Sequence, residues 1–358
     1  MNHVKQIQQK LIEKELDAIL ILDEKNQRYA CGFPFTDGAV LVSREKAWLI
    51  TDSRYIEAAE KTAGSCADVR LYDREHPLFA MLQSALKEAN VSSLGAEANK
   101  VSHMQYLQIE KMFGMPMRPA GELLSDLRAC KDAEEIEHLI ATQRISEKAL
   151  QETLRIIRPG MTEKQVAAEL VYHMLKNGSE GNSFDPIVVT GKNTSLPHGV
   201  PGNTVIRSGD FVTMDFGSLH GGYCSDMTRT VAVGSATDEM KNIYGIVLKA
   251  QLAGIAAARA GVTGAEIDGA ARNVIAEAGY GPYFGHGFGH SLGLDIHEMP
   301  NANPNGKTRM PVGAVVSAEP GIYLPGCFGV RIEDVMILRE DGCEVITKAP
   351  KSELIILS

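Results

Sequence analysis

The sequence predicts an α/β (α+β) protein with two domains, residues 1–127 and residues 128–358. A chain of 358 residues is too long for one ordinary core, because domains usually hold about 100–200 residues. Short apolar runs occur together with segments of helical periodicity, and the composition changes near residues 126–132. The change in composition places the domain boundary close to residue 128.

The first domain has the pattern of a small α/β unit. An amphipathic helix is predicted over residues 3–15, where apolar residues repeat at helical spacing: Val4, Ile7, Leu11 and Ile12. Short apolar runs predict strands at residues 17–22, 38–43 and 47–50. Further helices are predicted at residues 52–64, 76–90 and 101–114.

The second domain opens with one long helix, predicted from Leu127 to a stop at Pro159-Gly160. Acidic residues at 132–135 lie near its N-terminus, where the helix dipole favours them. A capping box at Thr162 and Gln165 predicts the start of the next helix, which ends at residues 177–178.

More strands and helices follow in the second domain. Apolar runs predict strands at residues 211–217, 223–234, 315–324 and 330–338. Helices are predicted at residues 237–260 and 264–279, the second opened by a capping box at Thr263 and Glu266. A turn at residues 220–222 joins the first two strands, so a hairpin can bring side chains of both together.

The composition argues against several classes of function. A net charge of −9 argues against a nucleic-acid partner, because nucleic-acid binding normally needs a basic surface. The N-terminal segment lacks the apolar centre of a signal peptide, and no apolar run approaches the roughly 20 residues of a spanning helix. We therefore expect a cytoplasmic protein with no membrane partner. The six cysteines form no C-x-x-C pair, so metal ligands have to come from Asp, Glu and His.

Acidic residues occur inside the apolar strand patterns of the second domain, where buried carboxylates are normally avoided. They are Asp215, Asp226, Glu319 and Glu333. A single strand carboxylate is more often exposed or paired with Arg than a metal ligand. Here the same domain contains four strand carboxylates and also a glycine-rich segment with three histidines, residues 285–298. Four carboxylates and one neutral imidazole carry a charge of −4, which two divalent cations such as Mn²⁺ balance.

Five segments, in this order, resemble the motifs of the pita-bread metallopeptidases, the family of methionine aminopeptidase, prolidase and aminopeptidase P. They are LPHGVPG (196–202), MDFGSLHGGYCSDMTRT (214–230), GHGFGHSLGLDIHE (285–298), SAEPGIY (317–323) and VRIEDV (330–335). NQRYACGFPFTDGAVLV (26–42) is similar to the N-terminal domain of the prolidase and aminopeptidase P branch. The resemblance implies a three-layer, creatinase-like α/β domain followed by a catalytic pita-bread domain.

The resemblance also implies a dinuclear metal centre with five ligands. Asp215 is expected to bind one metal with both oxygens, and Asp226 and Glu333 are expected to bridge the two metals. His290 and Glu319 are expected to complete the shell of the second metal. The ions are expected to be Mn²⁺, and Co²⁺ or Zn²⁺ also suit these ligands.

Catalytic roles follow from the same resemblance. Glu319 is the expected general base. His198 and His297 are expected to donate hydrogen bonds to the carbonyl oxygen of the scissile bond. His286 matches a histidine near the proline-side pocket, and the alternative for it is a structural, hydrogen-bonded histidine.

Three further residues are expected to line that pocket or to bind the peptide beyond it: Phe184, Tyr323 and Arg331. The alternative for Phe184 and Tyr323 is packing in the core. Arg331 equally fits a role in which it orients a metal-bound carboxylate.

These residues predict a dinuclear metal-dependent exopeptidase that hydrolyses the Xaa-Pro bond and forms a homodimer. Its substrates are either dipeptides, as for prolidase, or longer peptides with proline in second position, as for aminopeptidase P.

One alternative is a methionine aminopeptidase, although those enzymes generally lack a domain like residues 1–127. Creatinase shares the fold but not the metal set. A non-catalytic peptide-binding relative is the last alternative, and such proteins usually lose ligand residues.

Overall fold

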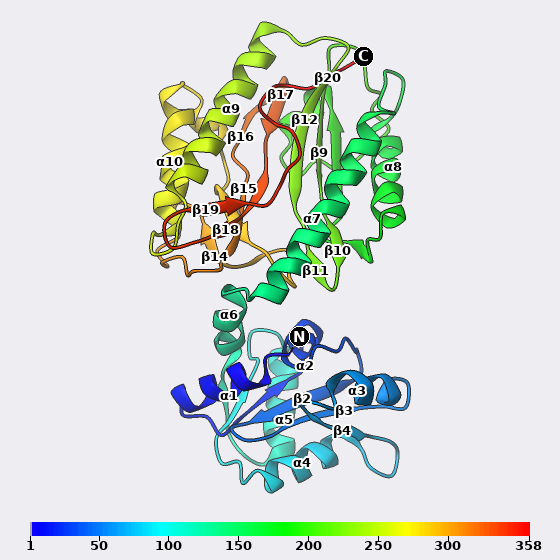
Figure 1. Cartoon of the computed structure of the whole chain (residues 1–358), viewed down its shortest axis with the longest axis vertical. Helices are drawn as coiled ribbons and strands as arrows, with labels where there is room; N and C mark the ends of the chain where they lie inside the picture. Colours follow the sequence, from blue (N-terminus) through cyan, green and yellow to red (C-terminus); the bar gives the residue numbers. More distant parts are fainter. Residues whose placement is uncertain (1) are drawn as a thin grey trace. The chain divides into compact units, whose positions relative to one another are not determined.

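The computed structural model describes residues 2–358, and the chain divides into two units, Met1–Arg128 and Ala129–Ser358. Each unit combines helices with sheets (Figure 1). Each also has its own hydrophobic cores. Both therefore have the α/β character that the sequence predicts. Among the described residues, no helix combines the length and the apolar character needed to cross a membrane.

A six-stranded sheet with the order β4-β3-β2-β1-β5-β6 forms the centre of the first unit. Its strands are β1 (Ala18–Ile21), β2 (Gly38–Ser43), β3 (Ala47–Thr51), β4 (Asp68–Leu71), β5 (Leu94–Ala96) and β6 (Met117–Pro119). Successive side chains of a strand point to opposite faces of the sheet. Accordingly, Ile19 and Ile21 of β1 belong to one core cluster, whereas Ala18 and Leu20 belong to another.

Helices cover both faces of this sheet. One cluster receives side chains from α1 (Val4–Glu13), α2 (Glu24–Cys31), α3 (Ile56–Ala63) and α6 (Gly121–Ala129). The other receives side chains from α4 (Leu78–Glu88) and α5 (His103–Phe113). The unit therefore has three layers.

Helix α2 is absent from the sequence prediction, because EKNQRYAC has no clear apolar period. Its two ends nevertheless carry recognisable signals. The side chain of Asp23 caps its N-terminus, and Gly32 ends it in the left-handed conformation with φ 71°. The prediction for residues 52–64 starts too early, since the Asp52 carboxylate accepts the N–H of Arg54 at 2.9 Å and holds a turn before α3.

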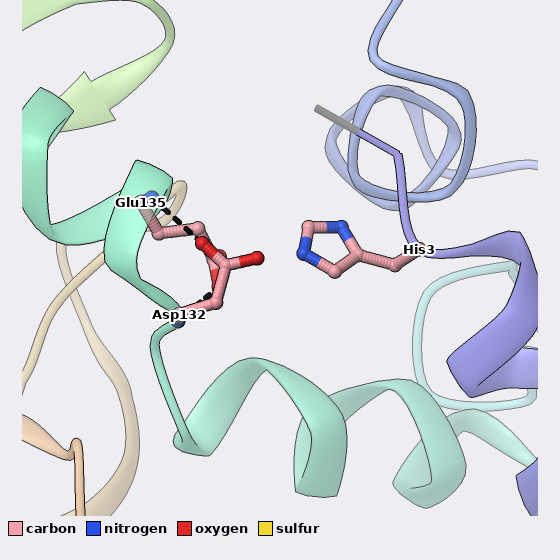
Figure 2. Close-up of side chains that lie close together, drawn as sticks. All are labelled: His3, Asp132 and Glu135. Carbon is pink, nitrogen blue, oxygen red and sulfur yellow. Dashed lines mark hydrogen bonds between the residues drawn. The ribbon is translucent and has the colours of Figure 1, made fainter.

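The long helix predicted at the start of the second domain is divided in the structure. Helix α6 ends at Ala129, and α7 spans Ala133–Leu154. Asp132 lies between them in extended backbone and accepts the N–H of Glu135 at 2.9 Å. The Glu135 carboxylate accepts the N–H of Asp132 at 3.0 Å in return (Figure 2). This capping box starts a new helix, so the prediction of one continuous helix was wrong.

The second unit contains two main sheets. The four-stranded sheet has the order β20-β12-β9-β8, with β8 (Ile187–Thr190), β9 (Phe211–Phe216), β12 (Met227–Val233) and β20 (Ile356–Leu357). The five-stranded sheet has the order β14-β13-β15-β18-β19, with β13 (Gly289–Ser291), β14 (Glu298–Ala302), β15 (Val315–Ala318), β18 (Asp334–Leu338) and β19 (Cys343–Val345). Short strands form two smaller sheets: β7 (Gly181–Asn182), β10 (Ser218–His220) and β11 (Tyr223–Cys224) in one, β16 (Gly321–Leu324) and β17 (Phe328–Arg331) in the other.

Each main sheet is covered by a pair of helices. Helices α7 and α8 (Glu163–Lys176) share a core cluster with β8, β9 and β12. Helices α9 (Asp238–Ala257) and α10 (Gly264–Glu277) run side by side (Figure 1). They share a second core cluster with β15 and β18. The capping boxes predicted at residues 162–165 and 263–266 are confirmed.

Three of the four acidic residues lie at breaks between strands, whereas the sequence patterns placed them inside strands. Asp226 directly precedes β12, and Glu333 lies between β17 and β18. Glu319 follows β15, where Pro320 lacks the N–H that would continue the ladder, and the chain re-enters a different sheet as β16. Asp215 alone lies within a strand, β9. A break lets the chain change sheets and turns the carboxylate away from regular strand geometry.

Candidate metal centre

Residues from both main sheets of the second unit surround a cavity of about 440 Å³. Ten of the eleven site residues predicted from the sequence line it: Phe184, His198, Asp215, Asp226, His286, His290, His297, Glu319, Arg331 and Glu333. Tyr323 is outside the lining and is 8% exposed. The fold thus gathers side chains that are up to 149 residues apart in the sequence.

The predicted ligand residues lie close together. One ligand atom from each of Asp226, His290 and Glu333 lies within 4.8 Å of the others. Nε2 of His290 is 3.5 Å from Oδ2 of Asp226 and 3.4 Å from Oε1 of Glu319. Asp215 borders the same cavity, and its charge contributes to the raised pKa of Asp226.

His290 presents one ring nitrogen to these carboxylates. Its backbone N–H donates to Oγ of Ser317 at 3.0 Å, and its Nδ1 lies 3.2 Å from the carbonyl oxygen of Ser291. A carbonyl oxygen only accepts hydrogen bonds, so Nδ1 carries the hydrogen and Nε2 keeps its lone pair. This is the tautomer that a histidine needs to bind a metal through Nε2.

Buried carboxylate oxygens test whether these residues fit a cation. Within residues 2–358, three of them have no hydrogen-bond partner: Oδ1 of Asp215, Oδ1 of Asp226 and Oε1 of Glu333. Burial, and then the neighbouring carboxylates, raise the pKa values of Asp226 and Glu333 well above the usual range. Burial also raises the pKa of Glu319 to about 7. Such a cluster is unfavourable unless a cation compensates it, so this set of oxygens and one imidazole fits divalent metals.

Arg331 holds two of the carboxylates in place. Its Nη2 donates to Oδ2 of Asp215 at 2.5 Å, and its Nε donates to Oγ1 of Thr228 at 3.0 Å. The Thr228 hydroxyl in turn donates to Oε2 of Glu333 at 2.7 Å. The guanidinium is buried, and these contacts occupy one oxygen of each carboxylate while the other oxygen of each stays without a hydrogen-bond partner.

A chain of hydrogen bonds leads from Arg331 to His286. Nη1 of Arg331 donates to the Tyr323 hydroxyl at 2.9 Å, and that hydroxyl lies 2.9 Å from Nε2 of His286. Nδ1 of His286 faces the carbonyl oxygen of Gly287 at 2.9 Å and therefore carries the ring hydrogen. Tyr323 consequently donates to Nε2, and its ring forms a wall behind His286.

An ion pair on α10 holds the loop that carries His286. Arg272 and Asp268 form a bidentate pair at 2.7 and 2.9 Å. Arg272 also donates to the carbonyl oxygens of Phe284 at 2.8 Å and His286 at 2.6 Å, while Asp268 accepts the N–H of Phe288 at 2.9 Å. Backbone contacts on both sides of His286 therefore fix its position in the cavity wall.

His198 and His297 are exposed at the cavity, whereas the predicted ligands are buried or half-buried. The ring of His297 packs edge-on against His290 with centroids 4.3 Å apart. Burial, followed by the neighbouring His290 and His198, lowers the pKa of His297. Phe184 is half-buried and lines the cavity.

Two family models match the chain. The model of metallopeptidase family M24 matches residues 137–340, and the model of the creatinase/prolidase N-terminal domain matches residues 3–130. The first match alone covers more than half of the chain. The chain belongs to metallopeptidase family M24. The protein is therefore a metallopeptidase, and its domain order is the one that the resemblance implied.

Relatives of this M24 protein align over almost its full length. The Xaa-Pro dipeptidase of Pyrococcus horikoshii is 35% identical over 353 residues, which cover 97% of each chain. An Xaa-Pro dipeptidase from Bacillus anthracis has a similar structure, with a TM-score of 0.94 and 42% identity over 99% of each chain. An X-Pro aminopeptidase from Thermotoga maritima has a TM-score of 0.92 and 37% identity, covering 97% of this chain and 99% of that one. These likenesses confirm the predicted fold class.

The sequence analysis did not predict several residues that line or support this cavity. Seven more residues line it: Ile187, Pro197, Gly287, Gly289, Ile296, Asn301 and Asn303. Thr228, which joins Arg331 to Glu333, was also missed. The alternation of side chains along a strand could have identified Thr228. It lies two residues after Asp226 and opposite Asp215 in the β9–β12 pair, so its side chain shares their face of the sheet. The two asparagines carry no comparable signal.

The neutral state of His286 predicts a pH dependence of stability. Burial lowers its pKa from 6.5 to about 4. As pH falls below about 6.5, His286 becomes protonated in the unfolded chain but stays neutral in the folded chain. The free energy of unfolding therefore decreases towards acid pH. In metal-free protein, we expect the free energy of unfolding of the wild type to fall by about 2 kcal/mol relative to His286→Asn between about pH 7 and pH 5. Urea unfolding of both proteins measures this difference. If it stayed constant between about pH 7 and pH 5, His286 would not be held neutral in the folded protein.

Proposed function

We propose that this protein is a dinuclear metal-dependent exopeptidase that hydrolyses the Xaa-Pro bond at the N-terminus of peptides or in dipeptides. The observation that carries the proposal is the convergence of Asp215, Asp226, His290, Glu319 and Glu333, with unpartnered buried oxygens, at one cavity. Relatives named as Xaa-Pro dipeptidases and X-Pro aminopeptidases support the substrate class.

In this proposal, the five converging residues hold two divalent ions, most simply Mn²⁺, with Co²⁺ and Zn²⁺ as alternatives. Asp215, Asp226 and Glu333 would supply carboxylate oxygens to the ions, and His290 and Glu319 would complete the set of ligands. Bound there, the ions supply Lewis acidity towards water and towards the scissile carbonyl group.

The protein's own side chains handle the protons. Glu319 accepts the proton of the attacking water and passes it to the leaving nitrogen, a role that its place at the cavity beside His290 suits. His198 and His297 lie exposed at the cavity and donate hydrogen bonds to charge that develops on the carbonyl oxygen. The exposed positions of both imidazoles leave them free to contact a substrate.

A proline after the scissile bond changes what the enzyme has to recognise. The nitrogen of that bond is tertiary and has no N–H, so recognition has to rely on the shape of the ring. We assign this recognition to Phe184, His286, Tyr323 and Arg331. The rigid chain from Arg331 through Tyr323 to His286 supports a fixed wall for a ring-sized group.

A panel of peptides tests the proposed function. We expect hydrolysis of Xaa-Pro or Xaa-Pro-Xaa peptides in the presence of Mn²⁺, and none of matched peptides with alanine in place of proline. Preference for the dipeptide indicates a dipeptidase, and preference for tri- and tetrapeptides indicates an aminopeptidase. Cleavage of Met-Ala-Xaa peptides without cleavage before proline would contradict the proposal and favour a methionine aminopeptidase.

The domain boundary, the oligomeric state and the location of the protein are proposed from its sequence. The division into a domain of residues 1–127 and a catalytic domain of residues 128–358, the homodimer and the cytoplasmic location stay predictions. We propose that the N-terminal domain contributes to dimer formation and narrows access for long peptides. Kinetics on peptides of increasing length, together with sedimentation of the intact protein, tests both roles.

A further inference from the structure

We propose that Lys131 and Glu298 form a buried ion pair that positions His297 for catalysis. The inference rests on the proposed function, because it assigns Lys131 a part in the same reaction. Neither residue borders the cavity. Lys131 acts through Glu298, and Glu298 acts on the turn that holds its chain neighbour His297.

The carboxylate of Glu298 closes the turn between β13 and β14. Its Oε1 accepts the N–H of Asp295 at 3.0 Å, and the N–H of Gly293 donates to the carbonyl oxygen of Asp295 at 3.0 Å. A Cβ on Gly293 would lie 2.8 Å from this carboxylate, so glycine leaves the space that the carboxylate occupies. His297 lies inside the segment that these contacts close. The conformation of the turn therefore depends on where the Glu298 carboxylate is held.

Lys131 holds that carboxylate from the other side. Its Nζ donates to Oε2 of Glu298 at 3.0 Å, and the side chains of Lys131 and Glu298 are only 1% and 7% exposed. A carboxylate buried to this extent needs a positive partner nearby. Removal of the Lys131 charge would raise the free-energy cost of burying the Glu298 carboxylate. The carboxylate would then move towards solvent.

The backbone of Lys131 is itself fixed. Its N–H donates to the carbonyl oxygen of Gly313 at 3.1 Å, and the capping box of α7 begins at the next residue, Asp132. Gly313 has φ 82°, and a Cβ there would lie 3.0 Å from the carbonyl oxygen of Lys131. The ammonium group therefore extends from an anchored point, which makes it suited to set the position of Glu298.

Lys131→Met provides the test, because it keeps the length of the side chain and removes its charge. We expect kcat on an Xaa-Pro substrate to fall about tenfold, since small displacements of a catalytic group reduce rates strongly. KM and bound Mn²⁺ should stay within about twofold of wild type, because Lys131 and Glu298 are not metal ligands and do not line the cavity. Lys131→Arg should recover most of the rate, and the exposed Lys307→Met serves as the matched control.

Hydrogen exchange of the metal-free protein gives a readout that is independent of activity. We expect amides of residues 293–298 to exchange faster in Lys131→Met than in wild type, with unchanged exchange in β9 and β12. An unchanged kcat, or faster exchange throughout the second unit, would overturn the positioning role. If the wild type cleaves no Xaa-Pro peptide, the proposed function fails by itself, while the exchange experiment still decides whether Lys131 holds the turn.

Discussion

Replacement of Glu319 by Gln is expected to lower kcat on Xaa-Pro peptides by about 10³-fold, because it removes the group that accepts and returns the proton. The change keeps the size of the side chain and one carbonyl oxygen. Glu319 is half-buried at the cavity, and its Oε1 lies 3.4 Å from Nε2 of His290, so it borders the place where the attacking water would be held. Steady-state kinetics at saturating Mn²⁺ measures the effect.

The exposed Glu340→Gln is the matched control for this experiment, since it makes the same chemical change away from the cavity. Its kcat should equal that of wild type. Retention of more than about a tenth of wild-type kcat by Glu319→Gln would exclude a general-base role, because such a group contributes about 10²–10⁴-fold. Another side chain of the cavity would then have to move the proton.

Replacement of Asp226 by Asn is expected to abolish binding of the metal pair and to change stability in opposite directions with and without metal. Burial and nearby carboxylates raise the pKa of Asp226 in the metal-free fold. A carboxyl with a raised pKa stabilises the fold while protonated, and that contribution is lost as pH rises through the folded pKa. At about pH 8, the metal-free Asn variant should therefore be more stable than the metal-free wild type.

Addition of Mn²⁺ should reverse that order. Binding at about a thousandfold above Kd stabilises a folded protein by about 4 kcal/mol, and only the wild type should gain this. Thermal unfolding with and without Mn²⁺, together with elemental analysis, measures both effects. The exposed Asp341→Asn should behave as wild type. Full Mn²⁺ stabilisation of Asp226→Asn would show that Asp226 is not a ligand.

The sequence was most informative where a residue type had to break a local pattern. A carboxylate within FVTMDFG and three histidines in a glycine-rich segment are unexpected for a folding role alone, and these positions border one cavity in the structure. Strand patterns could not show that Glu319 and Glu333 lie at breaks, because an apolar run has the same appearance whether the chain stays in one sheet or changes sheets. The division between β15 and β16 depends on tertiary pairing.

The residues that support the site were much harder to predict. Thr228 and Lys131 are common residue types in ordinary positions, and their roles arise from partners about a hundred or more residues away. Helix α2 was missed for a related reason, since its apolar side chains gather at one end and give no period. Local propensity and spacing contain no information on such distant contacts.

Diffraction from a crystal soaked in Mn²⁺, measured near the manganese absorption edge, shows whether these residues hold a pair of ions. We expect two anomalous peaks in the cavity of the second unit, both in contact with carboxylate oxygens of Asp226 and Glu333, one also with Asp215 and the other with Nε2 of His290. The absence of anomalous density among these residues, with manganese bound elsewhere on the protein, would contradict the proposed metal centre.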